Sequence, residues 1–259
     1  MGVIGKVPDM EHEFLAQIED AALNAWPSHR QMLYDGWVLR FTGGESKRVN
    51  SVNVRYPSSL PLAEKIAFCE DIYERQSLPV LYRCPGPFTT PNLLSALSTA
   101  GYIAFDTTYV LGREVKETGG LPTGIEVREM RSEDWLQMRA GFYGRDVEAF
   151  KIHAGILEMI VPEKVLIGLF VDGQAVACGM GVVQGHLLGY FSILTGKSAR
   201  RNGYGSAVMI ALTNWGDARG ATLGYLQVEG DNLPAQAMYE KLGFSLFYQY
   251  SYFRRESEG

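Results

Sequence analysis

The chain has 259 residues, of which 46% are hydrophobic and 20% charged, with a formal net charge of -5 at pH 7. This composition is typical of a globular protein that buries one large or two ordinary cores, and we expect two domains. The acidic balance disfavours a nucleic-acid partner and slightly favours a cationic one. No run approaches the roughly 18 apolar residues of a membrane span, and no signal-peptide core is visible. We therefore expect a cytoplasmic protein with no membrane partner.

The cysteines and histidines give no sign of a metal site. Cys69, Cys84 and Cys178 are odd in number and far apart, which disfavours both a disulfide framework and a zinc site, so we expect buried thiols. The histidines have no partner at metal-ligand spacing and are expected to be structural or on the surface (His12, His29, His153 and His186).

Hydrophobic periodicity predicts alternating helices and strands before residue 116. The predicted elements are, in order, a helix at 11–25, strands at 36–41 and 49–56 joined by a turn at Gly43-Gly44, a helix at 62–74, a strand at 79–84, a helix at 92–100 and a strand at 106–111. The segment Lys116 to Gly124 is rich in glycine and is predicted to be a linker. It divides the chain into domains at 1–118 and 124–259.

The second part repeats this alternation. The predicted elements are a strand at 125–130, helices at 132–142 and 147–160, strands at 165–171, 175–183 and 187–195, a helix at 204–218, a strand at 223–228, a helix at 234–242 and closing strands at 244–254. Strands that alternate with helices in this way predict an α/β protein with a mixed sheet.

An internal repeat relates the two parts. With an offset of 142 residues, Gly185 falls on Gly43 and Gly243 on Gly101, and the order of elements also matches. We infer two related domains. The first has no counterpart of the glycines and arginine of 200–205, because residues 58–63 stand there instead, and Pro61 removes an N–H donor. Only the second part is therefore expected to carry the chemistry.

The junction between residues 193 and 208 is suited to binding a phosphate. A strand ends there, a loop holds Arg200, Gly203 and Gly205, and a helix follows at once. Glycines let the backbone approach a ligand, and the N–H groups and dipole of a helix N-terminus favour negative charge. The segment 229–234 and the helix that bears Tyr239 follow the next parallel strand, so they are expected at the same edge of the sheet.

These residues resemble the GNAT superfamily of acyl-CoA-dependent N-acyltransferases, over roughly 124–255. The pattern [QR]-x-x-G-x-[GA] is met at 200–205, and N-x-x-A-x-x-x-Y-x-x-x-G-F is met from Asn232 to Phe244. The sequence also resembles a bacterial subgroup with a degenerate N-terminal half. The resemblance implies a tandem GNAT-like fold with a partial first copy and a complete second one. One departure is Gly196-Lys197, where many members have an aliphatic residue and proline.

The resemblance implies that acetyl-CoA, or another acyl-CoA, is the co-substrate, with no metal. Backbone N–H groups of the loop would hold the pyrophosphate, and the strand edge would pair with the pantetheine arm. The implied cofactor-binding residues are Ile193, Leu194, Thr195, Arg200, Arg201, Asn202, Gly203, Tyr204, Gly205, Ser206 and Asn232, and Lys197 would add charge.

The acceptor would be a small-molecule or peptide amine that attacks the bound acyl-CoA directly. The protein would be a monomer or a homodimer. Tyr239 is the expected general acid, because a tyrosine hydroxyl is protonated at neutral pH and can donate to a thiolate; the alternative is a helix residue packed on the sheet. Glu229 is the expected base or proton relay, or else a solvated loop carboxylate. Asn232 is also a natural N-cap. Asp146 and Glu148 lie in the region where acceptor sites form in the family.

Two further interpretations remain open at this point. The hairpin around Gly43-Gly44, with Trp37, Arg40, Arg48 and Asn50, is either a packed structural hairpin or one wall of an acceptor cleft. The chain could also be a non-catalytic acyl-CoA-binding or regulatory protein. A dehydrogenase is disfavoured, because the loop lacks G-x-G-x-x-G spacing.

Overall fold

The computed structural model describes residues 12–116 and 120–256, so part of the predicted linker and the first residue of the predicted first helix lie outside the described residues. The first half, before residue 117, contains α1 (His12–Ala25), β1 (Arg30–Tyr34), β2 (Trp37–Phe41), η1 (Lys47–Val49), β3 (Val52–Val54), α2 (Leu62–Arg75), β4 (Leu81–Pro85), η2 (Gly86–Phe88), α3 (Pro91–Thr99) and β5 (Tyr102–Glu114).

The second half, from residue 120, contains β6 (Glu126–Glu129), α4 (Ser132–Tyr143), η3 (Val147–Phe150), α5 (Lys151–Met159), β7 (Glu163–Val171), β8 (Gln174–Gln184), β9 (Leu187–Thr195), η4 (Lys197–Ala199), α6 (Tyr204–Asp217), β10 (Leu223–Glu229), α7 (Leu233–Lys241) and β11 (Ser245–Arg255). The predicted mixed α/β class is confirmed. Within the described ranges, no helix is long and apolar enough to cross a membrane.

One continuous sheet of 11 strands unites the two halves, in the order β1-β2-β3-β4-β11-β5-β10-β9-β8-β7-β6. Outward from the central pair, β4, β3, β2 and β1 on one side mirror β10, β9, β8 and β7 on the other. In both halves the two innermost of these strands pair in parallel, β4 with β3 and β10 with β9, and the next pair outward is antiparallel. The pairing thus has the symmetry that the 142-residue repeat predicts.

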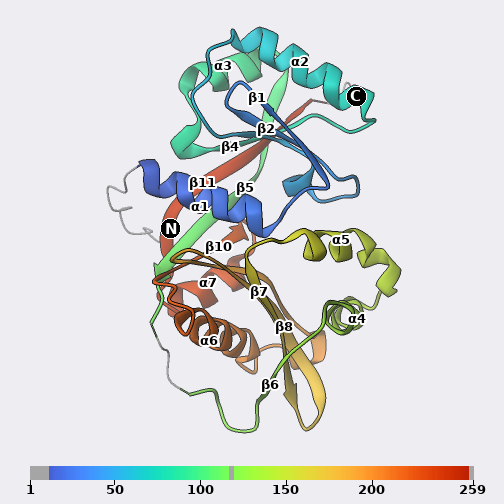
Figure 1. Ribbon diagram of the computed structural model, residues 1–259, viewed down its shortest axis with the longest axis vertical. Helices are drawn as coiled ribbons and strands as arrows, with labels where there is room; N and C mark the ends of the chain where they lie inside the picture. Colours follow the sequence, from blue (N-terminus) through green and yellow to red (C-terminus); the bar gives the residue numbers. More distant parts are fainter. Residues whose placement is uncertain (1–11, 117–119, 257–259) are drawn as a thin grey trace.

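The two halves exchange their last strands at the centre of the sheet. β5 pairs with β10 of the second half, and β11 pairs with β4 of the first half. β5 and β11 also pair with each other over most of their length. Figure 1 shows the two long strands crossing the middle of the molecule, in green and red. Each half therefore completes the sheet of the other.

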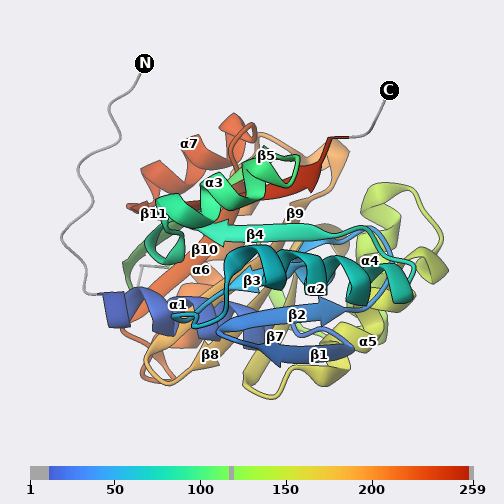
Figure 2. The same cartoon turned by 90° about the horizontal axis from the view of Figure 1, so that it is seen from above.

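Helices cover both faces of this sheet. α6 and α7 pack on one face of the second half, around Val208, Leu212 and Phe244. On the opposite face lie α4 and α5 together with α1, whose Leu15 and Ile18 join the same buried cluster. α2 and α3 pack over the first-half strands and contact each other, and in Figure 2 they are seen on either side of the β4 ribbon. A helix from the first half thus helps to build the core of the second.

Several elements differ from the sequence predictions. β1 was not predicted, because Arg30–Tyr34 is a largely exposed edge strand without apolar alternation. β5 is longer than the predicted strand at 106–111, because it is paired on both sides. The predicted helix at 147–160 divides into η3 and α5, and the closing strands form the single strand β11.

Candidate functional site

A pocket of about 520 Å³ opens beside the ends of β9 and β10. These strands pair in parallel only as far as Tyr190 and Leu226. Beyond that point β9 bulges, since Ser192 has a φ of +55° and the register with β8 shifts between Cys178 and Met180. A bulge bends a strand and leaves a residue outside the ladder. The strands therefore part, and side chains from both halves of the protein line the space between them.

The predicted anion-binding loop leads into α6. Gly203, with a φ of +80°, is the N-cap residue and no side chain caps the helix. Among the described residues, no acceptor is bonded to the backbone N–H groups of 201–206. Arg200 and Arg201 are exposed at the same loop. Free N–H groups, a helix dipole and two arginines make this helix start suitable for a phosphate.

The corresponding loop of the first half is closed by a side chain of the protein itself. The carboxylate of Asp35 accepts hydrogen bonds from the backbone N–H groups of Ser59 and Leu60, both at 3.0 Å, and pairs with Lys65 at 3.2 Å. These bonds hold the pKa of Asp35 well below its usual range. An internal carboxylate thus sits before α2, at the place where the second half leaves the N–H groups free.

Close packing brings the loop to the helix that bears Tyr239. A Cβ at Gly205 would lie 2.9 Å from Sδ of Met238 and 3.7 Å from Oγ1 of Thr195. α6, the end of β9 and α7 are therefore neighbours, as the sequence predicts from the parallel crossover.

Tyr239 lies in the pocket wall with only 8% of its surface exposed. Its ring packs edge-on against Phe244, with 5.8 Å between the ring centroids. Its hydroxyl makes no hydrogen bond to any other described residue. Burial raises the pKa of Tyr239 to about 12, so the hydroxyl keeps its proton at neutral pH. Tyr239 therefore packs on Phe244 through its ring and also has a protonated hydroxyl that is free to donate.

The other predicted residues divide into two sets. Glu229, Asn232 and Ile193 line the pocket, whereas Leu194, Thr195 and the loop residues from 200 to 206 lie outside its lining. Glu229 is exposed at the end of β10. The Asn232 side chain accepts a hydrogen bond from the N–H of Ala235 at 3.3 Å, which confirms it as the N-cap of α7.

The segment after the Gly43-Gly44 turn forms a wall of the pocket, from Glu45 to Arg48. Asn50 fixes this segment, because its Oδ1 accepts from the N–H groups of Thr42 and Gly43, both at 2.8 Å. Trp37, in contrast, is 2% exposed and belongs to the first-half core. Trp37 is therefore part of a packed core, as the structural interpretation predicts, whereas the segment after the turn lines the pocket. Outside this pocket, the Asp146 side chain caps η3 by accepting from the N–H of Glu148.

Sequence reasoning gave no site role to Trp26, Arg139 and Tyr250, which line the pocket, and it expected His153, also in the lining, to be structural or on the surface. His153 lies on α5, and its ring meets Trp26 edge-on at 5.6 Å. Burial, followed by the charge of Arg139, lowers the pKa of His153, so its imidazole is neutral at neutral pH. No motif marks these residues, although an arginine on the inner face of a helix was a signal available for Arg139.

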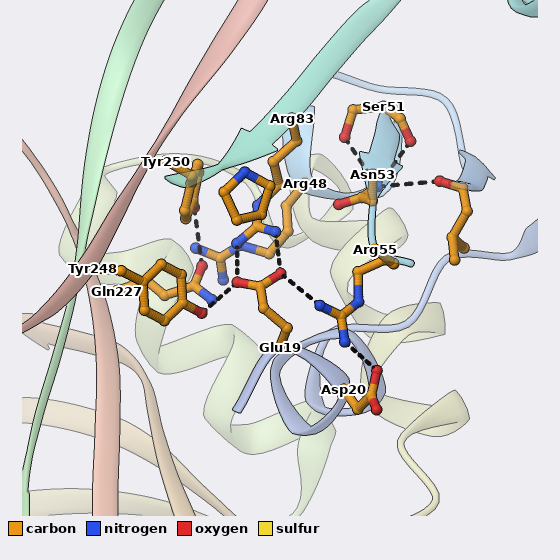
Figure 3. A network of polar contacts seen from close by, with 12 residues as sticks. Glu19, Asp20, Arg48, Ser51, Asn53, Arg55, Arg83, Gln227, Tyr248 and Tyr250 are labelled. Atoms are coloured by element: carbon orange, nitrogen blue, oxygen red, sulfur yellow. Dashed lines mark hydrogen bonds and ion pairs between the residues drawn. The ribbon is translucent and has the colours of Figure 1, made fainter. Parts of the chain in front are cut away.

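A buried ionic network lies at the first-half side of the pocket (Figure 3). Glu19 of α1 accepts hydrogen bonds from Arg83 of β4 and from the hydroxyl of Tyr248 on β11. The guanidinium of Arg83 lies 3.7 Å from the ring centroid of Tyr250, whose hydroxyl donates to Gln227 at 3.0 Å. Since Tyr250 and Gln227 line the pocket, the network connects this part of the pocket lining to the buried core.

The parted strands, the open helix start and the exchanged sheet define the class of protein, a GCN5-related N-acetyltransferase (GNAT) fold. A GCN5-related N-acetyltransferase from Kribbella flavida matches with a TM-score of 0.70 and 18% identity, covering 93% of this chain and 95% of that one. A tandem GNAT protein from the clavulanic acid biosynthesis pathway matches with a TM-score of 0.67 and 9% identity, covering 98% and 91%.

The family follows from sequence. The family model described as "Probable histone acetyltransferase Rv0428c C-terminal" matches residues 15–253, and the chain belongs to this family. YobR of Bacillus subtilis (strain 168), described as an uncharacterized N-acetyltransferase, is 26% identical over 244 residues, which cover 92% of this chain and 97% of YobR. The resemblance to GNAT N-acetyltransferases is thereby confirmed.

Proposed function

We propose that this protein transfers an acetyl or other short acyl group from acyl-CoA to a primary amine, by direct attack of the amine. The observation that carries the proposal is that the free N–H groups before α6 pack close to α7, whose Tyr239 has a protonated hydroxyl without a partner among the described residues. The first half, 1–118, serves as a structural partner and as a wall of the acceptor pocket, and the second half, 124–259, carries the transfer.

The chain has suitable groups for holding acyl-CoA. The N–H groups of 201–206, with Arg200 and Arg201, would bind the pyrophosphate, because a helix start without a cap lacks acceptors. The end of β9, from Ile193 to Thr195, has lost its parallel neighbour and can pair with the amide groups of the pantetheine arm. The Asn232 side chain already caps α7, so the proposed contribution of Asn232 is to orient this helix.

Acyl-CoA supplies an activated thioester. Tyr239 would donate its proton to the departing thiolate, which a raised pKa permits at every physiological pH. Glu229, exposed at the pocket, would receive a proton from the amine directly or through water. A thiol nucleophile is disfavoured, because Cys178 is fully buried and burial raises its pKa to about 12.

The acceptor is a small-molecule or peptide amine. The family description names histones, which supports a peptide amine as one class to test. The rival function, non-catalytic binding of acyl-CoA, would use the same helix start without needing a free hydroxyl in the pocket.

The test is release of CoA thiol from acetyl-CoA in the presence of a panel of primary amines, including histone-tail peptides, with acetyl-CoA affinity measured separately by calorimetry. We expect amine-dependent thiol release and acetylated product. Tight acetyl-CoA binding with no turnover on any amine would favour the rival, and failure to bind acetyl-CoA would reject both.

A further inference from the structure

Arg48 carries a positive charge that no described residue neutralises. It is half-buried on η1 and lines the pocket. Its guanidinium lies 5.9 Å from the ring centroid of Trp26, and its side chain makes no ion pair or hydrogen bond within the described ranges. An arginine side chain in a pocket, free of partners, is available to an anion.

Three more arginines are buried in the first half: Arg40, which donates to the carbonyl of Arg48, and Arg55 and Arg83, which lie at Glu19. Glu19 and Asp20 pair with Arg83 and Arg55 (Figure 3). Arg40, 1% exposed, is bound only by uncharged oxygen atoms. These five residues therefore contain three guanidinium groups and two carboxylates, and Arg48 adds a fourth guanidinium.

This excess acts on neighbouring groups. Burial, with the charges of Arg83 and Arg48, lowers the pKa of Arg40 to about 10. Burial alone would raise the pKa of Tyr250, but Arg83 and Arg48 lower it. Figure 3 shows Arg48, Arg83 and Tyr250 together, and Tyr250 lines the pocket. The pocket wall around Tyr250 therefore lies next to positive charge.

A second buried cation lines the same pocket from the second half. Arg139 of α4 is 6% exposed, and its Nη1 donates to the carbonyl of Ser192 at 3.1 Å. Its buried Nε has no hydrogen-bond partner, and no described carboxylate forms an ion pair with it. Two arginines that lack carboxylate partners thus line one cavity.

Three carboxylates line the pocket beside three cations, but none of the three carboxylates pairs with Arg48 or Arg139. Asp106 is paired with Lys47. Glu45 and Glu229 are exposed, and neither forms an ion pair with Arg48.

We propose that the acceptor amine carries an anionic group, a carboxylate or a phosphate, which binds Arg48 with its apolar part against Trp26. The planar fork of a guanidinium matches both anions with two hydrogen bonds. This inference rests on the proposed function, since it names the class of acceptor for the same pocket. Arg48 is then a specificity residue, and Arg139 of the second half adds positive charge to the same pocket.

The test compares amines that differ in one anionic group: L-phenylalanine with 2-phenylethylamine, and O-phosphoethanolamine with ethanolamine. We expect kcat/KM to favour the anionic member of at least one pair, and the preferred pair distinguishes carboxylate from phosphate. Arg48→Gln should reduce that preference by about tenfold or more, as loss of charged hydrogen bonds implies. Arg48→Lys should restore part of it. Lys151→Gln, which removes a charge from α5 outside the pocket lining, is the matched control and should not alter the preference.

A preference for the neutral amines, or a preference unchanged in Arg48→Gln, would overturn the inference. If no amine reacts, the proposed function fails, and binding decides the inference separately. N-acetyl-L-phenylalanine and N-(2-phenylethyl)acetamide would then be titrated into the CoA-saturated protein. Tighter binding of the anionic compound that disappears in Arg48→Gln supports the site, and equal binding of the two compounds rejects it.

Discussion

The hydroxyl of Tyr248, on the last strand, donates a hydrogen bond to the carboxylate of Glu19, on the first helix, across 229 residues of sequence. The same carboxylate is bound by Arg83, at the strand next to β11. One fully buried carboxylate therefore joins α1 and β4 of the first half to β11, the last strand of the second half.

Replacing Glu19 with glutamine should destabilise the protein strongly, because Arg83 then keeps a buried charge without its partner. The expected loss is about 3–5 kcal/mol in the free energy of unfolding. The measurement is urea unfolding followed by circular dichroism. Asp71→Asn is the control, since it breaks an exposed i,i+4 pair with Arg75 and should cost about 0.5 kcal/mol or less. Equal losses in the two variants would contradict the role of the network.

The same residue predicts how stability depends on pH. Burial raises the pKa of Glu19, but the charges and hydrogen bonds of Arg83, Arg55 and Tyr248 outweigh it and lower the pKa below 4.5. The unfolded chain therefore takes up a proton at a higher pH than the folded one. The contribution is complete above about 4.5 and is lost as pH falls through the lowered value. Unfolding midpoints measured from pH 7 to pH 3 should show a smaller acid loss in Glu19→Gln than in the wild type.

Removing the hydroxyl of Tyr239 should affect turnover without affecting acetyl-CoA binding. Tyr239→Phe keeps the packing on Phe244 but removes the proton donor, and kcat should fall by about tenfold or more. Tyr190→Phe is the matched control, because Tyr190 also lines the pocket but its hydroxyl bonds Thr213 at 2.9 Å. Steady-state kinetics and calorimetry separate the two effects. Wild-type turnover in Tyr239→Phe would remove this residue from the mechanism.

Gly203→Ala should weaken acetyl-CoA binding. The left-handed backbone at Gly203 costs a residue with a Cβ about 1–2 kcal/mol, so the N–H groups before α6 would turn away from the ligand. Gly220→Ala is the control, because its φ of +78° is nearly the same but it follows the opposite end of α6. Both variants should lose similar stability in thermal unfolding, and only Gly203→Ala should raise the Kd for acetyl-CoA. A parallel rise in both would argue that the loop has no special role.

The exchanged strands predict that the two halves depend on each other. Residues 1–118 and 124–259, expressed together as separate chains, should co-purify, because β5 and β11 each pair with strands of the other half. Gel filtration and circular dichroism of each half alone and of the mixture provide the measurement. Two stable halves that do not associate would show that the exchange contributes little to the fold.

Local patterns predicted most elements and the neighbourhood of the loop and Tyr239. Gly203 needs its left-handed backbone, and Asn232 caps the next helix, so both leave a signal within a few residues. The strand exchange leaves no such signal. β5 and β11 are long strands of equivalent position in the repeat, and which partner each one chooses depends on the whole fold. The sequence places Arg48 in a hairpin and His153 on a helix but does not indicate that the two line one pocket, because only the tertiary structure brings η1 and α5 together.

The unbroken sheet also determines how a substrate can enter. Hinge closure needs two rigid domains joined by a few hinge residues. In this protein, hydrogen-bonded strands of one sheet run across the boundary between the two halves. The width of the pocket is therefore fixed by the backbone, and a substrate enters by rotation of side chains at the pocket rim. Such a site should select acceptors by their fit to one fixed pocket shape.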